Sequence, residues 1–203
     1  LSRGLDEAGV RVFLNKEVNR KMIEENNPET VVIATGATPV IPDVPGIRGK
    51  NVVLAWDVLA DKVEVGQEVV IIGGGLVGLD TALHLAKQGK QVSVVEMLGE
   101  IARGTPWLRK LLLKQSLMDY RVCLYPGITL HSISDRGVSV IDSYQMLFLK
   151  ADSVVLATGS KAENELAEQL KGLVPELYAI GDCMEPRNSM EAIHEGFKVG
   201  REI

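Results

Sequence analysis

Three glycines with the spacing GxGxxG stand at the end of a run of apolar, mostly β-branched residues. Gly73, Gly75 and Gly78 follow the segment 69–72, and the residues after them take a helical pattern. A strand, a glycine-rich turn and a helix start in this order are typical of a site for the pyrophosphate of a dinucleotide. We interpret Gly73 as the tight turn, Gly75 as the point where the backbone approaches the phosphates, and Gly78 as a close contact between helix and sheet.

The residues after the turn add two features. Leu76 and Val77 open the predicted helix, where unpaired backbone N–H groups and the positive end of the helix dipole favour a bound phosphate. Glu96 ends the next predicted strand, 23 positions after Gly73 (96 − 73), close to the roughly 20 expected for an acidic ribose-binding residue. A carboxylate there accepts hydrogen bonds from ribose hydroxyls and repels a 2′-phosphate, so the sequence favours NADH over NADPH. Arg103 is either a counter-charge to such a phosphate or, as we favour, a solvated surface charge.

A further chemical feature follows a later apolar strand. Gly181-Asp182 ends the strand predicted at 177–180, and Asp182 is suited either to accept a hydrogen bond from a sugar-alcohol hydroxyl or to stabilise a turn. A helix predicted from about Met190 follows Asn188, a good helix N-cap residue. No side chains are assigned a catalytic role, because the cofactors carry the chemistry of hydride transfer and the protein orients them.

The elements that must position these residues form an α/β pattern. Predicted buried strands lead into glycine-containing turns, and predicted helices follow these turns. Three short strands joined by polar turns predict an antiparallel meander. The predicted helices cover 76–87, 106–120 and 163–170, and the predicted strands cover 10–14, 30–34, 69–72, 91–96, 122–125, 129–133, 138–141, 145–149, 152–157 and 177–180. We therefore expect a Rossmann-like three-layer domain with a parallel sheet and an antiparallel meander.

The tripeptide Ala-Thr-Gly occurs twice, each time at the end of a predicted buried strand. Thr35-Gly36 and Thr158-Gly159 bracket the glycine fingerprint, so we interpret each as a crossing between a domain and a second domain inserted into it. The predicted division is 1–36 and 160–203 for the outer domain, 37–50 for a proline-containing linker, and 51–159 for the inserted nucleotide-binding domain.

Composition narrows the function classes. The formal net charge of −5 and the lack of a Lys/Arg cluster argue against a nucleic-acid partner, and the apolar runs are too short to span a bilayer. Cys123 and Cys183 lie 60 positions apart (183 − 123), without CxxC or Cys/His ligand spacing. We expect no metal site in this segment and a reducing, cytoplasmic location.

On these residues the chain resembles the pyridine-nucleotide–disulfide oxidoreductase superfamily. More specifically, it is similar to the C-terminal portion of NADH:flavin oxidoreductases related to 2-enoate reductase and 2,4-dienoyl-CoA reductase. The matching stretches are 31–39, 70–78, 92–96, 178–183 and 192–196.

The resemblance implies an FAD domain interrupted by an NAD(P)H domain. Gly73, Gly75, Gly78 and Glu96 would hold NADH, and Gly159 would lie near the path of the nicotinamide. The residues implied along FAD are Thr35, Gly36, Gly181 and Asp182, with Met190 and Ala192 near its isoalloxazine ring. NADH would then reduce FAD.

In the full-length relatives, electrons continue through an iron–sulfur cluster to FMN in a preceding TIM barrel, where an enoate is reduced. The barrel, the cluster cysteines and the fingerprint of the FAD half-domain are not found in this sequence. The chain also lacks an initiator Met and a stop signal in its last helix, so we expect a fragment that binds NADH detectably and FAD weakly or not at all. A CxxxxC motif is missing too, which separates the chain from the disulfide-reductase branch.

Two other interpretations stay open at this point. One is a non-catalytic dinucleotide-binding module that senses or docks without hydride transfer. The other is a flavoprotein of the same fold that resembles the ferredoxin and nitrite reductases.

Overall fold

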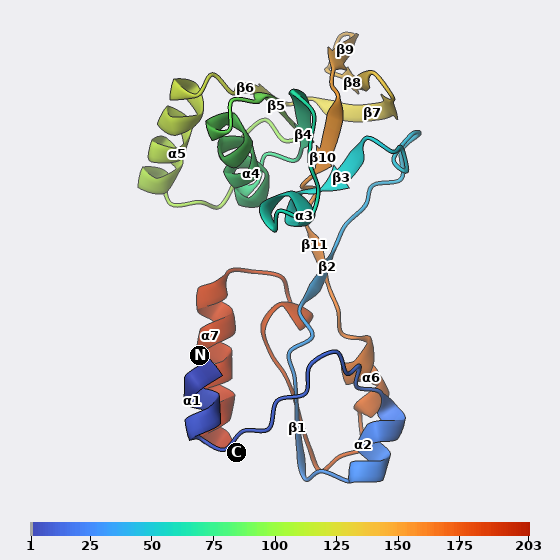
Figure 1. The fold of residues 1–203 in the computed structure, drawn as a ribbon, viewed down its shortest axis with the longest axis vertical. Helices are drawn as coiled ribbons and strands as arrows, with labels where there is room; N and C mark the ends of the chain where they lie inside the picture. Colours follow the sequence, from blue (N-terminus) through green and yellow to red (C-terminus); the bar gives the residue numbers. More distant parts are fainter. Residues whose placement is uncertain (1) are drawn as a thin grey trace. The chain divides into compact units, whose positions relative to one another are not determined.

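A computed structural model describes residues 2–203, with side chains from residue 4 onward. The chain divides into two compact units, one formed by Leu1–Thr38 with Ala162–Ile203 and the other by Pro39–Lys161 (Figure 1). The second unit is thus inserted into the first, and each is described by itself. The division into cofactor domains made from the sequence stays a prediction.

The inserted unit is built on a parallel sheet. Its five strands follow the order β3-β10-β4-β5-β6, and every neighbouring pair is parallel. The strands are β3 (Val52–Leu54), β4 (Glu68–Ile72), β5 (Gln91–Glu96), β6 (Cys123–Pro126) and β10 (Ser153–Leu156). The order reverses between β4 and β10, because the chain moves from β4 to β5 on one side and returns on the other. Such a switch point is where open α/β sheets bind ligands.

Helices cover one face of this sheet and an antiparallel meander covers the other (Figure 1). The helices are α3 (Ala55–Leu59), α4 (Leu76–Lys87) and α5 (Trp107–Asp119), and the meander is β7 (Thr129–Ser134), β8 (Gly137–Ile141) and β9 (Met146–Lys150). The parallel sheet, the helices and the meander confirm the predicted three-layer α/β class.

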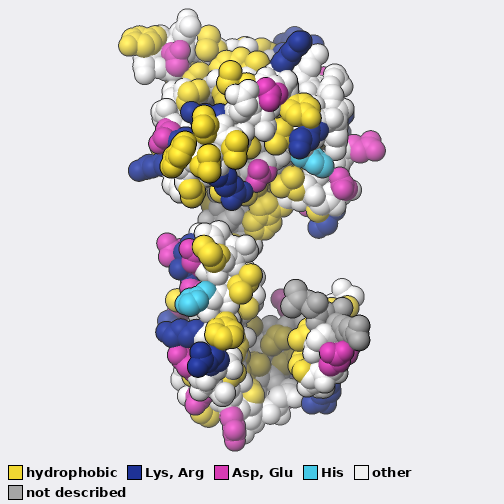
Figure 2. Space-filling view, turned by 90° about the vertical axis from the view of Figure 1, so that its left-hand side faces the viewer, with side chains coloured by type: hydrophobic (Ala, Val, Ile, Leu, Met, Phe, Trp, Pro, Cys, Tyr) yellow, Lys and Arg dark blue, Asp and Glu magenta, His cyan; other side chains and the backbone are white. Residues whose placement is uncertain are grey.

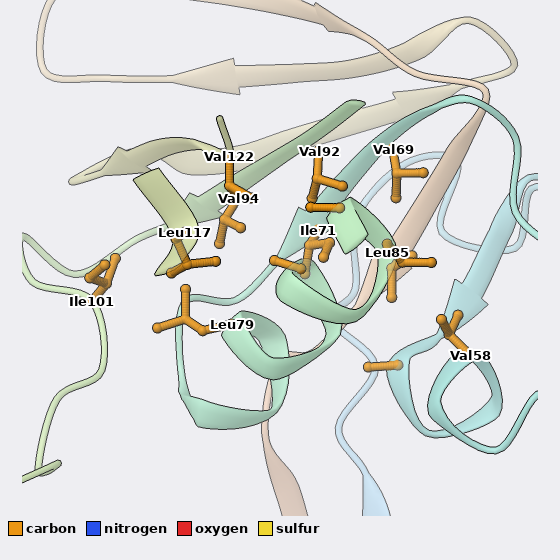
Figure 3. Close-up of a cluster of buried hydrophobic side chains, with 14 of the residues drawn as sticks. Val58, Val69, Ile71, Leu79, Leu85, Val92, Val94, Ile101, Leu117 and Val122 are labelled. Atoms are coloured by element: carbon orange, nitrogen blue, oxygen red, sulfur yellow. The ribbon is translucent and has the colours of Figure 1, made fainter. Parts of the chain in front are cut away.

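The two cores of this unit follow from the alternation of side chains along a strand. Val69 and Ile71 of β4 join the cluster beneath the helices, together with the fully buried Leu79 of α4 (Figure 3). Val70 and Ile72 join the second cluster, beneath the meander. Because four of the five residues of β4, 69–72, are apolar, this part of the strand can be buried on both faces, as parallel strands usually are.

Helix α5 is less covered than α4. Leu117 is its one fully buried residue, whereas Trp107, Leu108 and Leu112 are more than half exposed. In Figure 2, the face that carries α5 shows hydrophobic side chains interspersed with Lys and Arg.

The outer unit contains a small parallel pair of strands. β1 (Thr30–Ile33) pairs with β12 (Glu176–Ala179), and Ile33 lies opposite Ala179. Buried Leu170 and Cys183 pack beside Ile33 in a third hydrophobic cluster. The remaining elements are α1 (Ser2–Glu7), α2 (Arg20–Asn26), α6 (Glu165–Leu170), the short 3₁₀ helix η1 (Gly181–Cys183) and α7 (Ser189–Glu202).

Two short strands carry the chain between the units. β2 (Ala37–Pro39) pairs with β11 (Ser160–Ala162), and each contains a boundary between the units. The Val40 N–H donates to the Gly159 carbonyl, and the Thr158 hydroxyl donates to the Val40 carbonyl at 2.5 Å. The second Ala-Thr-Gly turn is thereby tied to the segment that follows β2.

The strand predicted at 10–14 is wrong. This segment has no regular structure, and Val10, Val12 and Leu14 are 48%, 56% and 82% exposed. Alternating apolar residues form a strand only beside a partner that takes up their backbone hydrogen bonds. No described residue supplies such a partner here.

Among residues 2–203, none of the helices combines the length and the apolarity that crossing a bilayer requires.

Candidate functional site

The carboxyl edge of the parallel sheet carries a cavity of about 540 Å³. Its floor is a row of residues at the ends of four neighbouring strands: Leu54 is paired with Leu156, Leu156 with Ile72, and Ile72 with Val95. All four line the cavity. The volume lies within the roughly 300–1,000 Å³ typical of sites for small molecules and cofactors.

The three fingerprint glycines have three distinct geometries in this edge. Gly73 has a φ of +113°, and a Cβ there would lie 2.2 Å from the Ala157 carbonyl oxygen. Gly78 faces the turn itself, because its Cβ would lie 1.9 Å from the Gly73 carbonyl oxygen. Gly75 has open space where its Cβ would be, and it lines the cavity. These geometries agree with a tight turn, a helix-to-sheet contact and an open approach to the backbone.

The start of α4 is free of side-chain caps. Gly75 occupies the N-cap position, and no side chain accepts a hydrogen bond from the first turn. Leu76 and Val77 line the cavity beside it. The N–H groups of this turn, with the positive end of the helix dipole, form a cradle suited to an anion.

Glu96 joins two loops as well as lining the cavity. Its Oε2 accepts the Gly74 N–H at 2.6 Å, and its Oε1 accepts the Leu98 N–H at 2.7 Å. The Gly74 carbonyl in turn accepts the N–H of buried Ala102 at 2.8 Å. The carboxylate therefore fixes the glycine turn to the loop after β5. Each carboxylate oxygen has a further lone pair for a hydroxyl.

The described part of the cavity lining carries one charged side chain, and that charge is negative. Glu96 is the one ionisable side chain among the described residues that line it. Arg103 is exposed and is not part of the lining, in agreement with a solvated surface charge. Among residues 2–203 there is also no group of three or more His, Cys, Asp or Glu placed to hold a metal ion.

The structure brings most of the predicted nucleotide-binding residues together. Those around the cavity are Gly73, Gly75, Leu76, Val77, Glu96 and Gly159, with Gly78 buried behind them. An apolar part of the lining was not predicted from the sequence, and it includes Val40, Pro42, Leu54, Trp56, Met97, Ile128 and Leu130. The run Val52-Val53-Leu54 was the available signal, but three residues are too short to identify a strand by periodicity.

The remaining predicted residues lie in the outer unit: Thr35, Gly36, Gly181 and Asp182 follow the carboxyl ends of β1 and β12, and Met190 and Ala192 lie in the first turn of α7. The Thr35 hydroxyl donates to the Glu163 carbonyl, and the Glu163 N–H donates to the Gly36 carbonyl at 3.0 Å. The single S–H of buried Cys183 is shared between the carbonyl oxygens of Ile180, at 3.0 Å, and Ile33, at 3.3 Å, which joins the two strand ends.

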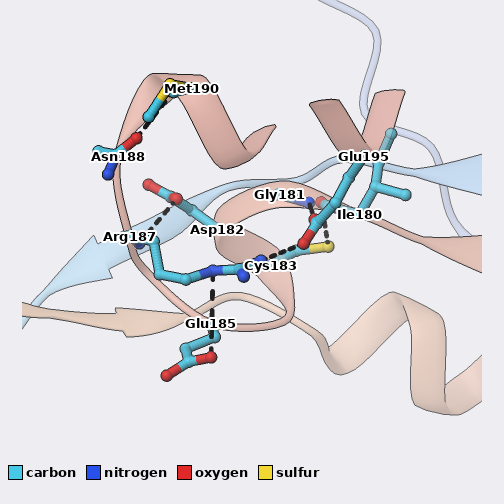
Figure 4. Close-up of polar contacts among 9 residues, drawn as sticks. All are labelled: Ile180, Gly181, Asp182, Cys183, Glu185, Arg187, Asn188, Met190 and Glu195. Carbon is cyan, nitrogen blue, oxygen red and sulfur yellow. Dashed lines mark hydrogen bonds and ion pairs between the residues drawn. The ribbon is translucent and has the colours of Figure 1, made fainter. Parts of the chain in front are cut away.

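Gly181 and Asp182 are held by a polar network beneath α7 (Figure 4). The Gly181 N–H donates to Glu195 Oε2 at 2.6 Å, and the Arg187 N–H donates to Asp182 Oδ1 at 3.1 Å. The Arg187 guanidinium pairs with the other oxygen of Glu195. The Gly181 N–H and this guanidinium both stabilise the carboxylate, so the pKa of Glu195 falls below its usual value. The loop 181–187 is thus fixed at both ends.

The start of α7 differs from the start of α4, because a side chain caps it. Asn188 Oδ1 accepts the Met190 N–H at 2.9 Å. Met190 is 71% exposed, and Ala192 lies near Gly181, 3.5 Å from the position a Cβ there would take. One N–H of the first turn is therefore already paired within the chain.

Comparisons with known proteins agree with this fold and these turns. A family model described as pyridine nucleotide-disulphide oxidoreductase matches residues 4–200. An NADH oxidase of Thermoanaerobacter brockii is 35% identical, over 100% of this chain and 32% of that protein. A cinnamate reductase of Clostridium sporogenes is 32% identical, over 98% of this chain and 30% of that protein.

Among solved structures, a complex of 2-naphthoyl-CoA reductase with 2-naphthoyl-CoA has a TM-score of 0.92. It is 34% identical over 100% of this chain and 31% of its own. The chain thus spans about a third of the length of these curated relatives. The chain belongs to the pyridine nucleotide-disulphide oxidoreductase family, which with its NADH oxidase relative implies FAD and NADH as cofactors.

Proposed function

We propose that this chain binds NADH at the carboxyl edge of its parallel sheet and delivers hydride to FAD within a longer flavin-dependent oxidoreductase. The observation that carries the proposal is the glycine turn at the switch point between β4 and β10. Its helix start is uncapped by any side chain, and Gly75 leaves open space beside it. A pyrophosphate needs this combination of close backbone approach and unpaired N–H groups.

The preference for NADH rests on Glu96. Its carboxylate lines the cavity at the end of β5, the position from which an acidic residue binds the ribose next to adenine. The Gly74 and Leu98 N–H groups hold both of its oxygens in place, so the ribose would meet an acceptor that is already oriented. The same negative charge would repel the 2′-phosphate of NADPH.

In the outer unit, Asp182 and the residues near it would hold part of FAD. Asp182 Oδ1 is taken up by the Arg187 N–H, which orients the carboxylate and leaves its second oxygen for a sugar-alcohol hydroxyl. Thr35-Gly36 and Gly181 lie at the same strand ends. When bound, FAD would take a hydride from NADH and a proton from solvent, which yields NAD⁺ and reduced flavin. The residues of this chain would bind and orient the cofactors.

For the final electron acceptor we propose an enoate or enoyl thioester, reduced elsewhere in the longer protein. Two relatives support this class by name, a cinnamate reductase and a 2-naphthoyl-CoA reductase. Both named substrates contain carbon–carbon double bonds conjugated to a carboxylic acid or thioester.

Calorimetric titration of the chain with NADH and NADPH tests the nucleotide site. We expect saturable binding of one NADH per chain and weaker binding of NADPH. A chain that binds neither nucleotide, or that binds NADPH more tightly, would contradict the proposal. Rapid mixing of the full-length, FAD-loaded protein with NADH tests hydride transfer, because flavin absorbance near 450 nm is lost on reduction.

A further inference from the structure

We propose that Trp56 is the platform on which the nicotinamide ring of the bound dinucleotide rests. This inference deepens the proposed function and rests on it. Trp56 is the second residue of α3 and lines the same cavity as the glycine turn. Trp56 belongs neither to the GxGxxG fingerprint nor to an Ala-Thr-Gly strand end, so the sequence motifs do not predict its role.

Strand pairing places Trp56 on a definite side of the site. Leu54 ends β3 and pairs with Leu156 of β10, which in turn pairs with Ile72 of β4. Trp56 lies two residues after Leu54, and Gly73 lies one residue after Ile72, so both follow strand ends at the same edge of the sheet. β3 is therefore two strand spacings, about 10 Å, from β4. Glu96 lies on the opposite side, at the end of the next strand, β5.

This order sets the direction of a dinucleotide across the edge. With its pyrophosphate on the turn at Gly73 and Gly75 and its adenosine ribose at Glu96, the other half must extend over β10 toward β3. It passes Gly159, which lines the cavity just beyond β10. The wall that it reaches is the one formed by Leu54 and Trp56.

The chemistry of this wall fits a flat, weakly polar ring. Val40, Pro42 and Leu54 line the cavity together with Trp56, and none of them carries a charge. Trp56 is 42% exposed and lines the cavity, so part of its indole surface is available to a ligand. Indole offers the largest aromatic face in proteins for stacking, and its face also attracts a cationic ring such as that of NAD⁺.

Residues other than Trp56 anchor helix α3 to the core. Helix α3 is anchored by Ala55 and Val58, which are 1% and 3% exposed and belong to the core cluster beneath the helices. Trp56 is not part of that cluster. Truncation of Trp56 should therefore change the cavity wall while α3 stays in place.

The test compares two ligands that differ only in the nicotinamide. NADH and ADP-ribose are titrated calorimetrically into the wild-type chain, Trp56→Ala and Trp56→Phe. Because stacking on an aromatic side chain contributes roughly 1–3 kcal/mol, we expect Trp56→Ala to raise the Kd of NADH at least about fivefold. The Kd of ADP-ribose should stay within about twofold, and Trp56→Phe should recover most of the NADH affinity.

The chain offers a matched control, because its other tryptophan lies outside the cavity. Trp107 begins α5 and is 74% exposed. Trp107→Ala should bind both ligands as the wild type does. In Trp107→Phe, the emission of Trp56 should be quenched by NADH with the calorimetric Kd, and ADP-ribose should quench it far less.

The outcomes separate the two proposals. If wild-type chain shows no saturable NADH binding, the proposed function fails and the Trp56 platform fails with it. If NADH binds but Trp56→Ala leaves its Kd unchanged, or weakens ADP-ribose equally, only the Trp56 platform is overturned.

Discussion

Substitution of Gly78 by alanine isolates the contact between helix α4 and the glycine turn. The added Cβ would lie 1.9 Å from the Gly73 carbonyl oxygen, whereas ordinary contacts begin at 3.4 Å, so about 1.5 Å (3.4 − 1.9) of separation must be created. The Cβ is fixed to the helix backbone and the Gly73 oxygen is itself a backbone atom, so neither can rotate away as the end of a flexible side chain would. Overpacking costs about 3 kcal/mol at the upper end of its usual range, and the better helix propensity of alanine returns about 1 kcal/mol.

We therefore expect Gly78→Ala to lower the free energy of unfolding by about 2 kcal/mol (3 − 1). Urea unfolding followed by far-UV circular dichroism measures this difference. Gly75→Ala is the matched control, because its Cβ would meet nothing within 4 Å and its φ of −72° is available to alanine. It should cost about 1 kcal/mol or less, as expected for a glycine N-cap replaced by alanine, yet it should weaken NADH binding. Equal stability of Gly78→Ala and the wild type would refute the packing argument.

Three further outcomes are expected. Glu96→Ala should weaken NADH binding and narrow the preference for NADH over NADPH in calorimetric titrations, and an unchanged ratio of the two Kd values would count against the ribose assignment. FAD should bind the chain much more weakly than NADH, or not at all, because the sequence contains one GxGxxG fingerprint; tight stoichiometric binding of FAD would contradict this. The contacts with Gly181 and Arg187 lower the pKa of Glu195 in the folded chain. They therefore stabilise the folded chain at pH values above the usual carboxyl pKa of 4.5, and this stabilisation is lost as the pH falls through the folded pKa. The stability advantage of the wild type over Glu195→Gln should therefore shrink between pH 7 and pH 3 in urea titrations, and a constant difference would contradict the argument.

Local periodicity predicted the long elements of the inserted unit well. Helix α4 and strand β5 span the predicted residues 76–87 and 91–96 without a shift. Each is long enough to show its period, and each ends at a glycine-containing turn or an acidic residue. Short elements were missed, because α3 with five residues and β3 with three carry too little pattern to be recognised.

The strand prediction for the segment 10–14 is wrong for the opposite reason. Its alternating apolar residues carry a strand pattern, but no described strand lies beside them to accept their backbone hydrogen bonds. α2, which was not predicted, is set by the Asn19 cap at its start and by the left-handed Asn27 at its end. Neither signal stands out in a short polar stretch until the backbone is seen.

By itself, the sequence predicted the chemical type of the site. The spacing of Gly73, Gly75 and Gly78 and the acidic end of the next strand are local requirements of a turn, a helix start and the proposed ribose acceptor, and all lie within 24 residues (73–96). Only the tertiary structure decided how this site is enclosed. Pairing of β10 between β3 and β4 brings Trp56 and Gly159 to the same cavity as the glycine turn, and folding turns the Glu96 carboxylate toward the Gly74 and Leu98 N–H groups. Contacts between residues far apart in the chain depend on strand order, which no local pattern encodes.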